Sequence, residues 1–224
     1  MHNLKDFFVK YKAVALDVCG VLTTEKSVWQ YIHERLGLWT GNAERFQEDF
    51  NAGLISYREF CERDALLWAG IGAAKMEEIV RGLPYREGIG DLFDGIGALG
   101  LVPGLISTGL TLLTERIAGD FGVGFSVANR LILEDGVLTG GVEIAVGHDK
   151  KGTALLNFAD SISIGVDSAE VIAVGDGLSD IPMFKEAGCS IGFGNVAEDV
   201  AEAADLVIGE SLFELKELIH KLSY

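Results

Sequence analysis

Cysteine is scarce in this chain: of 224 residues only three are cysteines, Cys19, Cys61 and Cys189. They are odd in number and far apart, and they form no CxxC pair and no cluster of metal ligands. The sequence therefore predicts neither a disulfide framework nor a structural zinc site.

Basic residues are few as well: 18 Lys and Arg stand against 34 Asp and Glu, a formal net charge of -16. Because a phosphate backbone attracts lysine and arginine, this balance argues against a nucleic-acid partner. No apolar run approaches the roughly 18 uninterrupted residues of a membrane span. The N-terminal stretch MHNLKDFFVKYK mixes charged and apolar side chains, so we expect no signal peptide and a cytoplasmic protein that does not act at a membrane.

Apolar material is plentiful, with 49% hydrophobic and 23% charged residues. This composition suits a packed core and excludes a largely disordered chain. The length allows one domain, or one domain with a substantial insertion.

Short apolar runs alternate with amphipathic stretches along the chain. Strands are expected at Lys12–Val18, Gly100–Thr108, Ala169–Gly177, Cys189–Gly194 and Ala204–Gly209. Helices are expected at Leu110–Gly119, Lys151–Ala159, Leu178–Ala187, Val196–Ala203 and Ser211–Leu222. Nearly continuous apolar strands suit a parallel sheet covered on both faces. The alternation predicts an α/β fold with a Rossmann-like, doubly wound parallel sheet.

The segment from about Glu25 to Leu83 interrupts this alternation, because it has helical patterns and no convincing strand. Asn42 and Ser56 are its expected helix N-caps, and Gly53 and Gly70 its expected helix stops. An insertion directly after the first strand would lie above that strand's carboxyl end, where open α/β sheets bind ligands. The expected division is a core of residues 1–24 and 84–224 with a helical cap of residues 25–83.

A second interruption is the stretch SVANRLILEDGVLTGGVEI. Apolar and polar residues alternate on both sides of Asp135-Gly136, a dipeptide that supplies the turn conformation of a hairpin. The stretch therefore predicts a β-hairpin.

Polar residues that could carry chemistry stand where predicted strands end or helices begin: Asp17, Ser107, Thr108, Lys151, Asp176 and Asp180. Each by itself is commonly a cap, a turn residue or a solvated side chain. Taken together, at the carboxyl ends of strands in one α/β chain, they indicate a single site.

This set of side chains suits phosphoryl transfer. A carboxylate such as Asp17 can accept a phosphoryl group and hand it to water, which splits one difficult displacement into two. A Mg²⁺ ion with Asp176 or Asp180 among its oxygen ligands would shield that carboxylate from the phosphate charge. The Ser107–Thr108 pair can bind phosphate oxygens, and Lys151 can neutralise charge in the transition state.

The chain resembles the haloacid dehalogenase superfamily, and within it the phosphoserine phosphatases, most densely in ANRLILEDGVLTGGVE and VIAVGDGLSDIPMFKEAGCSIGF. The resemblance spans nearly the whole chain and implies a Mg²⁺-dependent hydrolase for a small phosphorylated metabolite, with a helical cap over the substrate. It makes Asp17 the nucleophile, Ser107 the phosphate hydroxyl and Lys151 the phosphate lysine. Asp176 would ligate the metal, and Asp180 would ligate or brace it.

The resemblance also suggests contacts to a serine moiety from the cap. Arg63, in CERDALL, is the candidate for the substrate carboxylate, because a guanidinium matches a carboxylate in a two-pronged geometry. The alternative interpretation is that Arg63 is an exposed arginine on the surface of a helix. Glu25 is the candidate for the amine, although it stands one position early and Lys26 occupies the matching position. Lys26, and Ser179 in place of the usual asparagine, favour a different small phosphate.

Cys19 stands two residues after Asp17, where the family carries a second aspartate. In the family the backbone carbonyl of this residue ligates the metal, and its carboxyl group is the general acid and base. Cys19 retains only the carbonyl, and positioned proton transfer contributes about 10²–10⁴ in rate. A thiol with an ordinary pKa of about 8.5 could donate a proton but would be a poor base. The alternative interpretation is that the Cys19 side chain serves only as a small apolar group that packs in a crowded turn.

The sequence thus predicts a Mg²⁺-dependent phosphomonoester hydrolase of the phosphoserine phosphatase type, acting through an aspartyl-phosphate on Asp17. Because Cys19 lacks the carboxyl group that the family uses as general acid and base, the activity could be weak or altered. Two alternatives stay open: an enzyme for a different small phosphate, and a catalytically silent protein that binds a phosphorylated metabolite. A monomer and a homodimer are both compatible with the sequence.

Overall fold

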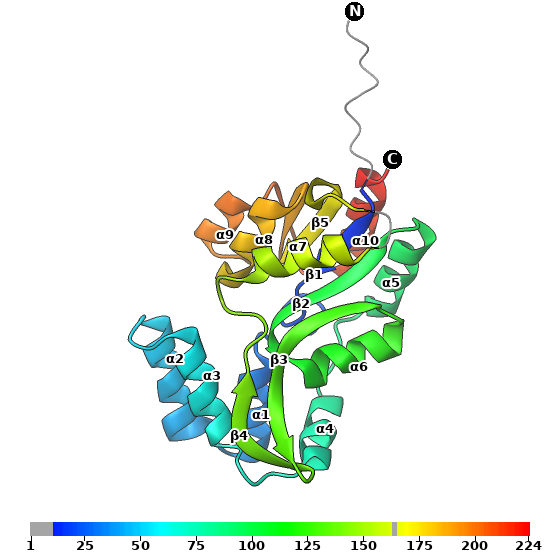
Figure 1. Cartoon of the computed structure of the whole chain (residues 1–224). Coiled ribbons are helices and arrows are strands. Elements are labelled where there is room, and N and C mark those ends of the chain that lie inside the picture. The colour runs from blue at the N-terminus through cyan, green and yellow to red at the C-terminus, as the bar shows by residue number, and fades with distance from the viewer. Residues whose placement is uncertain (1–10, 163–164) are drawn as a thin grey trace, which may run out of the picture.

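The computed structural model describes residues 11–162 and 165–224 of the chain. Most of the N-terminal stretch for which we expect no signal peptide, residues 1–10, lies outside the described residues. In the described part, seven strands form one sheet in the order β4-β3-β2-β1-β5-β6-β7 (Figure 1). The strands are β1 (Ala13–Leu16), β2 (Val102–Leu110), β3 (Phe125–Glu134), β4 (Val137–Glu143), β5 (Val171–Gly175), β6 (Cys189–Phe193) and β7 (Leu206–Ile208).

Strand β1 lies at the centre of the sheet and pairs in parallel with β2 on one side and with β5 on the other. The chain first builds outward to β2 and β3, and then adds β5, β6 and β7 on the opposite side of β1. The carboxyl end of β1 is therefore the topological switch point, where open α/β sheets bind ligands. The predicted α/β fold with a Rossmann-like parallel sheet is confirmed.

The predicted β-hairpin is β3–β4, and it is also part of the main sheet. The first half of β3 pairs in parallel with β2, and the second half pairs antiparallel with β4. Asp135 and Gly136 both have positive φ, at 50° and 77°, which is the turn geometry expected of an Asp-Gly hairpin.

Helices cover both faces of the sheet: α5 (Ile89–Ala98), α6 (Thr111–Phe121), α7 (Lys151–Ser161), α8 (Ile181–Glu186), α9 (Glu198–Ala203) and α10 (Leu212–Leu222). Successive side chains of a strand point to opposite faces. Val14 and Leu16 accordingly pack in one core cluster with α5, α6 and α10. Ala13 and Ala15 pack in a second cluster with α7, α8 and α9.

Helix α5 was not expected from the sequence, because the segment GIGDLFDGIG is rich in glycine. A glycine in a helix costs about 1 kcal/mol relative to alanine, so local propensity disfavours this helix. Its apolar residues Leu92, Phe93 and Ile96 are nevertheless buried against the core. Gly95 faces Lys216 of α10 so closely that an added Cβ would lie 2.7 Å from a carbon of the lysine side chain. Tertiary packing therefore overrides propensity here.

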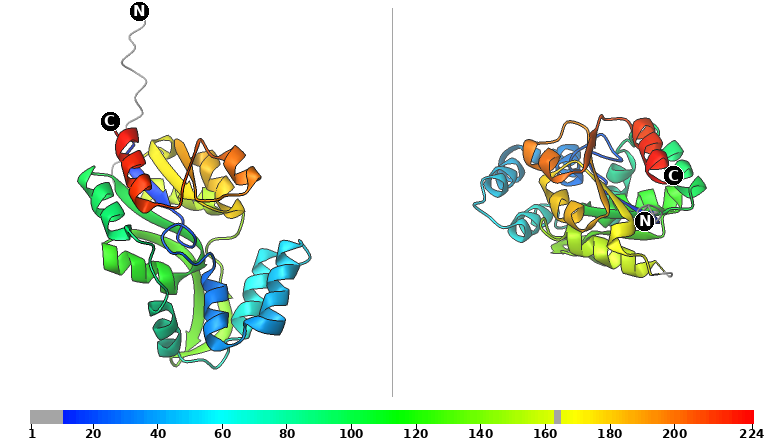
Figure 2. Two further views of the ribbon diagram at one scale, coloured as in Figure 1. Left: turned by 180° about the vertical axis from the view of Figure 1, so that it is seen from behind. Right: turned by 90° about the horizontal axis from the view of Figure 1, so that it is seen from above.

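Four α-helices form the region between β1 and α5: α1 (Val28–Leu36), α2 (Glu44–Asn51), α3 (Tyr57–Leu66) and α4 (Ala73–Arg81). They lie together at one end of the molecule, beside the far end of the β3–β4 hairpin (Figures 1 and 2). Backbone hydrogen bonds join the two parts: Gly70 donates to Leu138 at 2.9 Å, and Ala73 donates to Gly136 at 2.8 Å. The hairpin thus anchors the loop between α3 and α4.

The expected helix ends in this region are largely confirmed. The Ser56 side chain accepts a hydrogen bond from the Glu59 N–H at 3.1 Å and caps α3. Gly53 and Gly70 follow α2 and α3 with positive φ. The prediction for Asn42 is wrong, because α2 begins after Ala43 and has no side-chain cap.

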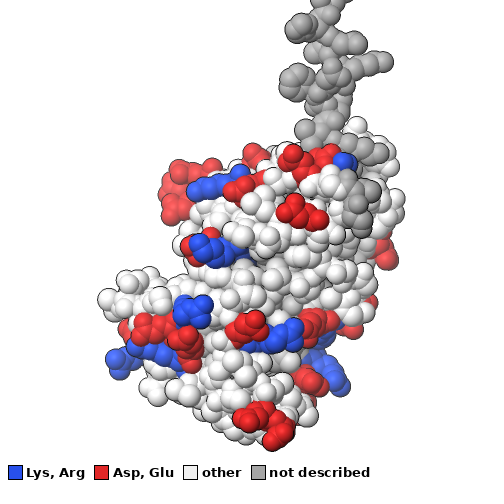
Figure 3. Space-filling model, in the orientation of Figure 1, with Lys and Arg blue, Asp and Glu red and all other residues white. Residues whose placement is uncertain are grey.

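The surface carries the acidic excess of the sequence. On the face drawn in Figure 3, basic side chains lie among acidic ones. Among the described residues, no helix combines the length and the apolar character needed to cross a membrane.

Candidate active site

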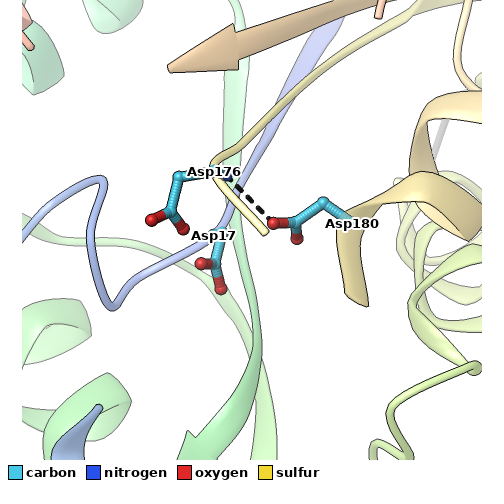
Figure 4. A group of neighbouring side chains, drawn as sticks. All are labelled: Asp17, Asp176 and Asp180. Carbon is cyan, nitrogen blue, oxygen red and sulfur yellow. Dashed lines mark hydrogen bonds between the residues drawn. The ribbon is translucent and has the colours of Figure 1, made fainter. Parts of the chain in front are cut away.

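Three aspartates meet at the carboxyl edge of the sheet, at the switch point. Asp17 directly follows β1, Asp176 directly follows β5, and Asp180 lies at the end of the short turn before α8. Because β1 and β5 are paired in parallel, the residues that follow them emerge at the same edge. One carboxylate oxygen from each lies within 4.8 Å of the others. Figure 4 shows the three side chains arriving from separate segments.

Lys151 lies between two of these carboxylates. Its Nζ donates to Asp17 Oδ1 at 2.5 Å and to Asp180 Oδ1 at 2.6 Å, and its side chain is fully buried. Burial lowers the pKa of Lys151, but the carboxylates of Asp17 and Asp180 outweigh it, so its pKa is raised above the ordinary value. The lysine therefore remains a buried ammonium group.

The other Asp180 oxygen organises the loop after β5. Asp180 Oδ2 accepts hydrogen bonds from the N–H groups of Asp176 and Gly177, both at 3.0 Å. Lys151 occupies Oδ1. With both oxygens engaged, Asp180 has the geometry of a bracing residue, one of the two roles that the resemblance implies.

Crowding makes the charged form of the other two carboxylates unfavourable. Burial raises the pKa of Asp17 to about 8, against the lowering effect of Lys151. Burial, with the charge of Asp180 added, raises the pKa of Asp176 to about 6. Gly20 lets Asp176 approach, because a Cβ there would lie 2.2 Å from Asp176 Oδ2. A cluster of carboxyl oxygens whose charged forms need a compensating cation fits a hard divalent cation.

Ser107 and Thr108 lie near the end of β2, which continues two residues further than the sequence predicts. The pairing register of β2 with β3 shifts between Ile106 and Leu110, which marks a local irregularity at this point. Ser107 is buried, and its Oγ accepts a hydrogen bond from the Gly109 N–H at 2.9 Å. Both residues line the same cavity as Asp17.

Cys19 lines this cavity close to Asp17. Burial raises the pKa of the Cys19 thiol to about 12, and the neighbouring charge of Asp17 adds to the increase. The thiol therefore remains protonated at neutral pH, and no thiolate is available there to act as a base.

The cavity has a volume of about 330 Å³ and lies between the sheet edge and the helical region. Its sheet side is polar, with Asp17, Cys19, Ser107, Thr108, Asp176 and Ser179. Its helical side carries four aromatic rings, those of Trp29, Phe50, Tyr57 and Phe60, together with Lys26, Ser27, Val28, Gln47 and Asn51, and His148 also belongs to the lining.

The two residues expected to contact a serine moiety lie outside this lining. Arg63 donates to Glu59 on the preceding turn of α3 at 2.6 Å, and its guanidinium lies over the Phe46 ring at 5.4 Å. Arg63 thus has the contacts of an arginine on a helix surface, which is the alternative interpretation given above. Glu25 also lies outside the lining, where its backbone carbonyl accepts from Gly20 at 2.9 Å, and Lys26 faces the cavity in its place.

Three further residues of the site were missed by sequence reasoning. The Tyr57 hydroxyl donates a hydrogen bond to the Thr108 carbonyl. Asn129 Nδ2 donates to the same carbonyl and to the Tyr57 oxygen, both at 3.0 Å. His148 packs edge-on against Phe50 at 5.3 Å. Asn129 stands in the hairpin stretch that the sequence singles out, and His148 lies three residues before Lys151. Tyr57 has no sequence signal beyond its place at the start of a helix.

Comparisons with known proteins agree with this geometry. A family model for haloacid dehalogenase-like hydrolases matches residues 137–211. The phosphoserine phosphatase of Halobacterium salinarum is 32% identical over 185 residues, which cover 80% of this chain and 84% of that protein. The chain belongs to the haloacid dehalogenase superfamily, in its phosphoserine phosphatase-like branch. It is accordingly a hydrolase of the phosphatase type.

Solved structures of this superfamily extend the likeness over nearly the whole chain. A substrate-bound phosphoserine phosphatase superposes with a TM-score of 0.81 at 26% identity and covers 95% of this chain and 98% of its own. A phospho-aspartyl intermediate analogue of a phosphoserine phosphatase superposes with a TM-score of 0.79 at 26% identity. The superposition covers 93% of this chain and 99% of that structure. The haloacid dehalogenase-like fold therefore includes both the sheet and the helices α1 to α4.

Proposed function

We propose that this protein is a Mg²⁺-dependent phosphomonoester hydrolase that acts on a small phosphorylated metabolite through a phospho-aspartate on Asp17. The observation that carries the proposal is the contact of the fully buried Lys151 ammonium with Asp17 at 2.5 Å, at the sheet side of the cavity. A related phosphoserine phosphatase has been solved as a phospho-aspartyl intermediate analogue, which supports the same chemistry here.

In this proposal the carboxylate cluster and Lys151 prepare the nucleophile. Asp17, Asp176 and the carbonyl oxygen of Cys19 would hold the Mg²⁺ ion, which when bound shields the phosphate charge from the carboxylates. Lys151 holds Asp17 in place and offsets negative charge as it spreads over the phosphoryl group. Asp180 keeps both Lys151 and the loop after β5 in position.

The reaction itself has two steps. Asp17 forms a bond to phosphorus while the bond from phosphorus to the ester oxygen breaks, and the leaving oxygen then takes a proton. Water next cleaves the phospho-aspartate, which releases phosphate and restores the carboxylate. Ser107 and Thr108 bind the phosphoryl oxygens in both steps. Because Cys19 has no carboxyl group, the leaving oxygen receives less help than in a site with a second aspartate.

Residues 25–83 serve as a cap in this proposal. They supply the helical wall of the cavity, and Tyr57 contacts the backbone of the phosphate-binding segment at Thr108. The positions of Lys26 and Arg63 favour a small phosphate other than phosphoserine as the substrate.

The decisive test is Mg²⁺-dependent phosphate release by the wild type and by Asp17→Asn, on acetyl phosphate and on phenyl phosphate. We expect turnover by the wild type, loss of at least about 10³-fold in the variant, and an acid-stable ³²P label only on the wild type. Asp94→Asn, an exposed change on α5, serves as the matched control and should keep full activity. A wild type that binds Mg²⁺ but releases no phosphate from either compound would instead indicate a silent binding protein.

A further inference from the structure

The part of the cavity that would receive the leaving group is walled by aromatic rings. The Phe50 ring lies 5.3 Å from both the Phe60 and the His148 rings, measured between centroids. The Tyr57 ring lies 5.9 Å from that of His148, and Trp29 continues the wall at 6.2 Å from Phe60. The rings are tilted or edge-on to one another except for the stacked pair Phe50 and Phe60, so they offer ring faces and edges against which a planar group can pack.

Charge in the cavity is unevenly distributed. Among the described residues that line it, the only carboxylates are Asp17 and Asp176, both in the cluster at the sheet edge. Lys26 is the one lysine of that lining, and no arginine belongs to it. Its Nζ lies 3.9 Å from Asp176 Oδ2. An ammonium group on the substrate would therefore be repelled by Lys26 and would find no carboxylate beyond the metal cluster to pair with, so only the aromatic rings would attract it.

We propose that this site selects the phosphate esters of phenols that carry no ammonium group. Phe50 and Lys26 would set this selectivity. This inference rests on the proposed function and names the class of its substrate. Phe50 would stack on the ring of the leaving group, and Lys26 would repel an ammonium group.

Position 19 independently points to the same class of leaving group. An aryl oxide leaves phosphorus more readily than an alkoxide, so it depends less on a proton donor, and Cys19 offers no carboxyl group. In the first step Asp17 forms its bond to phosphorus and the bond to the phenolic oxygen breaks. The phenoxide then takes a proton from solvent, and water hydrolyses the phospho-aspartate to inorganic phosphate.

Binding tests this selectivity independently of leaving-group reactivity. Calorimetry with the Mg²⁺-loaded wild type would compare benzylphosphonate with 2-amino-4-phosphonobutanoate, which carries the ammonium and carboxylate of a serine moiety. We expect benzylphosphonate to bind at least about tenfold more tightly, a difference of about 1.4 kcal/mol. Equal or tighter binding of the amino acid analogue, or binding of neither compound at millimolar concentration, overturns the proposal.

Two variants with matched controls assign the selectivity to residues. Lys26→Glu should shift the affinity ratio toward the amino acid analogue by at least about tenfold, whereas Lys75→Glu, the same change on the exposed side of α4, should leave it unchanged. Phe50→Leu should weaken benzylphosphonate binding by about three- to tenfold. Phe46→Leu, on the same helix but under Arg63, should have no effect. Unchanged affinities in Lys26→Glu and Phe50→Leu would contradict the assigned roles.

Turnover then separates this proposal from the function on which it rests. If the wild type binds benzylphosphonate selectively but hydrolyses neither phenyl phosphate nor acetyl phosphate, the selectivity stands and the proposed hydrolase fails. If it hydrolyses both compounds but prefers the amino acid analogue in binding, the hydrolase stands and the selectivity fails.

Discussion

The Tyr57 hydroxyl donates a hydrogen bond to the backbone carbonyl of Thr108, and so joins helix α3 to the end of strand β2. Asn129 of β3 donates to the same carbonyl and to the Tyr57 oxygen, and its Oδ1 accepts from the Val146 N–H at 2.9 Å. Trp29 Nε1 of α1 donates to the Thr108 carbonyl as well, at 3.4 Å, so three segments distant in sequence converge on the backbone of a residue that lines the cavity. This network fixes the helical wall of the cavity relative to the sheet.

Tyr57→Phe tests this network. The change removes two hydrogen bonds, the one that Tyr57 donates to Thr108 and the one that it accepts from Asn129. It should cost about 1–3 kcal/mol, a fall in Tm of about 2–12 °C. Because Asn129 still donates to Thr108, we expect kcat/KM to fall only about three- to tenfold, mainly through a higher KM. Tyr85→Phe removes a comparable hydrogen bond to Asp120, which lies outside the cavity lining, and should leave kcat/KM unchanged. An unchanged KM in Tyr57→Phe would show that the network does not position the cap.

Cys19→Asp should restore a proton donor to the site. We expect kcat for an alkyl phosphate such as glycerol 2-phosphate to rise by at least about a hundredfold, because positioned proton transfer contributes about 10²–10⁴. Phenyl phosphate should gain much less, since its leaving group needs less protonation. Cys19→Asn has the same shape without the acid and should give neither gain. Equal gains on both substrates would argue against a proton-donor role at this position.

Divalent cations should stabilise the protein in proportion to the charge on its carboxylate cluster. Addition of Mg²⁺ should raise Tm, and EDTA should reverse the increase, because a ligand of the folded state shifts the unfolding equilibrium. Asp176→Asn should remove most of the Mg²⁺-dependent shift, and Asp94→Asn, exposed on α5, should retain it. A full Mg²⁺ response in Asp176→Asn would rule out this residue as a principal ligand.

The same cluster predicts a pH dependence for the metal-free protein. Burial raises the pKa of Asp17 to about 8 and that of Asp176 to about 6. A carboxyl whose pKa is raised by folding contributes stability below its unfolded pKa and loses it as pH rises through the folded value. Tm in EDTA should therefore fall from about pH 4 to pH 8, through both carboxyls up to about pH 6 and through Asp17 above it, and the Mg²⁺-induced increase should grow over the same range. A metal-free Tm that rises across this range would contradict the assignment.

Asp64 is a buried carboxylate outside the cluster at the sheet edge, inside the helical region. Its Oδ1 lies 3.3 Å from His33 Nε2, but the geometry makes no hydrogen bond, and both Asp64 oxygens lack a hydrogen-bond partner. On the other side of the imidazole, Trp68 Nε1 donates to His33 Nδ1 at 3.2 Å. Burial raises the pKa of Asp64, against the lowering effect of His33. The charged carboxylate is therefore a cost to folding.

Asp64→Asn keeps the shape of this side chain and removes its charge. Because the pKa of Asp64 is raised on folding, the wild type loses stability as pH rises above the ordinary carboxyl range, and the variant does not. We expect Tm to increase by about 2–6 °C near pH 7, and the difference to shrink toward acid pH. Thermal melts at several pH values would measure it. A less stable variant at pH 7 would show that the charge of Asp64 supports His33.

The sequence could predict the core and the sheet side of the site because both depend on local pattern. Continuous apolar runs identify buried parallel strands, and the polar residue that ends each run must emerge at one edge of the sheet. Asp17, Asp176 and Lys151 are therefore placed by their positions relative to β1, β5 and α7. Helix α5 escaped prediction because its glycines oppose the helix locally, whereas burial of its apolar face against the core supports it.

The helical side of the cavity could not be predicted in the same way. An amphipathic pattern places a residue on one face of a helix, but it does not determine which neighbouring element that face contacts. Tyr57 and Arg63 are six residues apart on α3, and at 3.6 residues per turn they project from different faces. The packing of α3 against β4 and α2 turns Tyr57 toward Thr108 and leaves Arg63 with Glu59. The sequence by itself determined the α/β core, the strand-end positions of the clustered carboxylates and the presence of a thiol at position 19, because these depend on residue type and strand order. Only the tertiary structure decided which side chains of α1, α2 and α3 line the cavity, since helix docking is a non-local balance of packing and ion pairing.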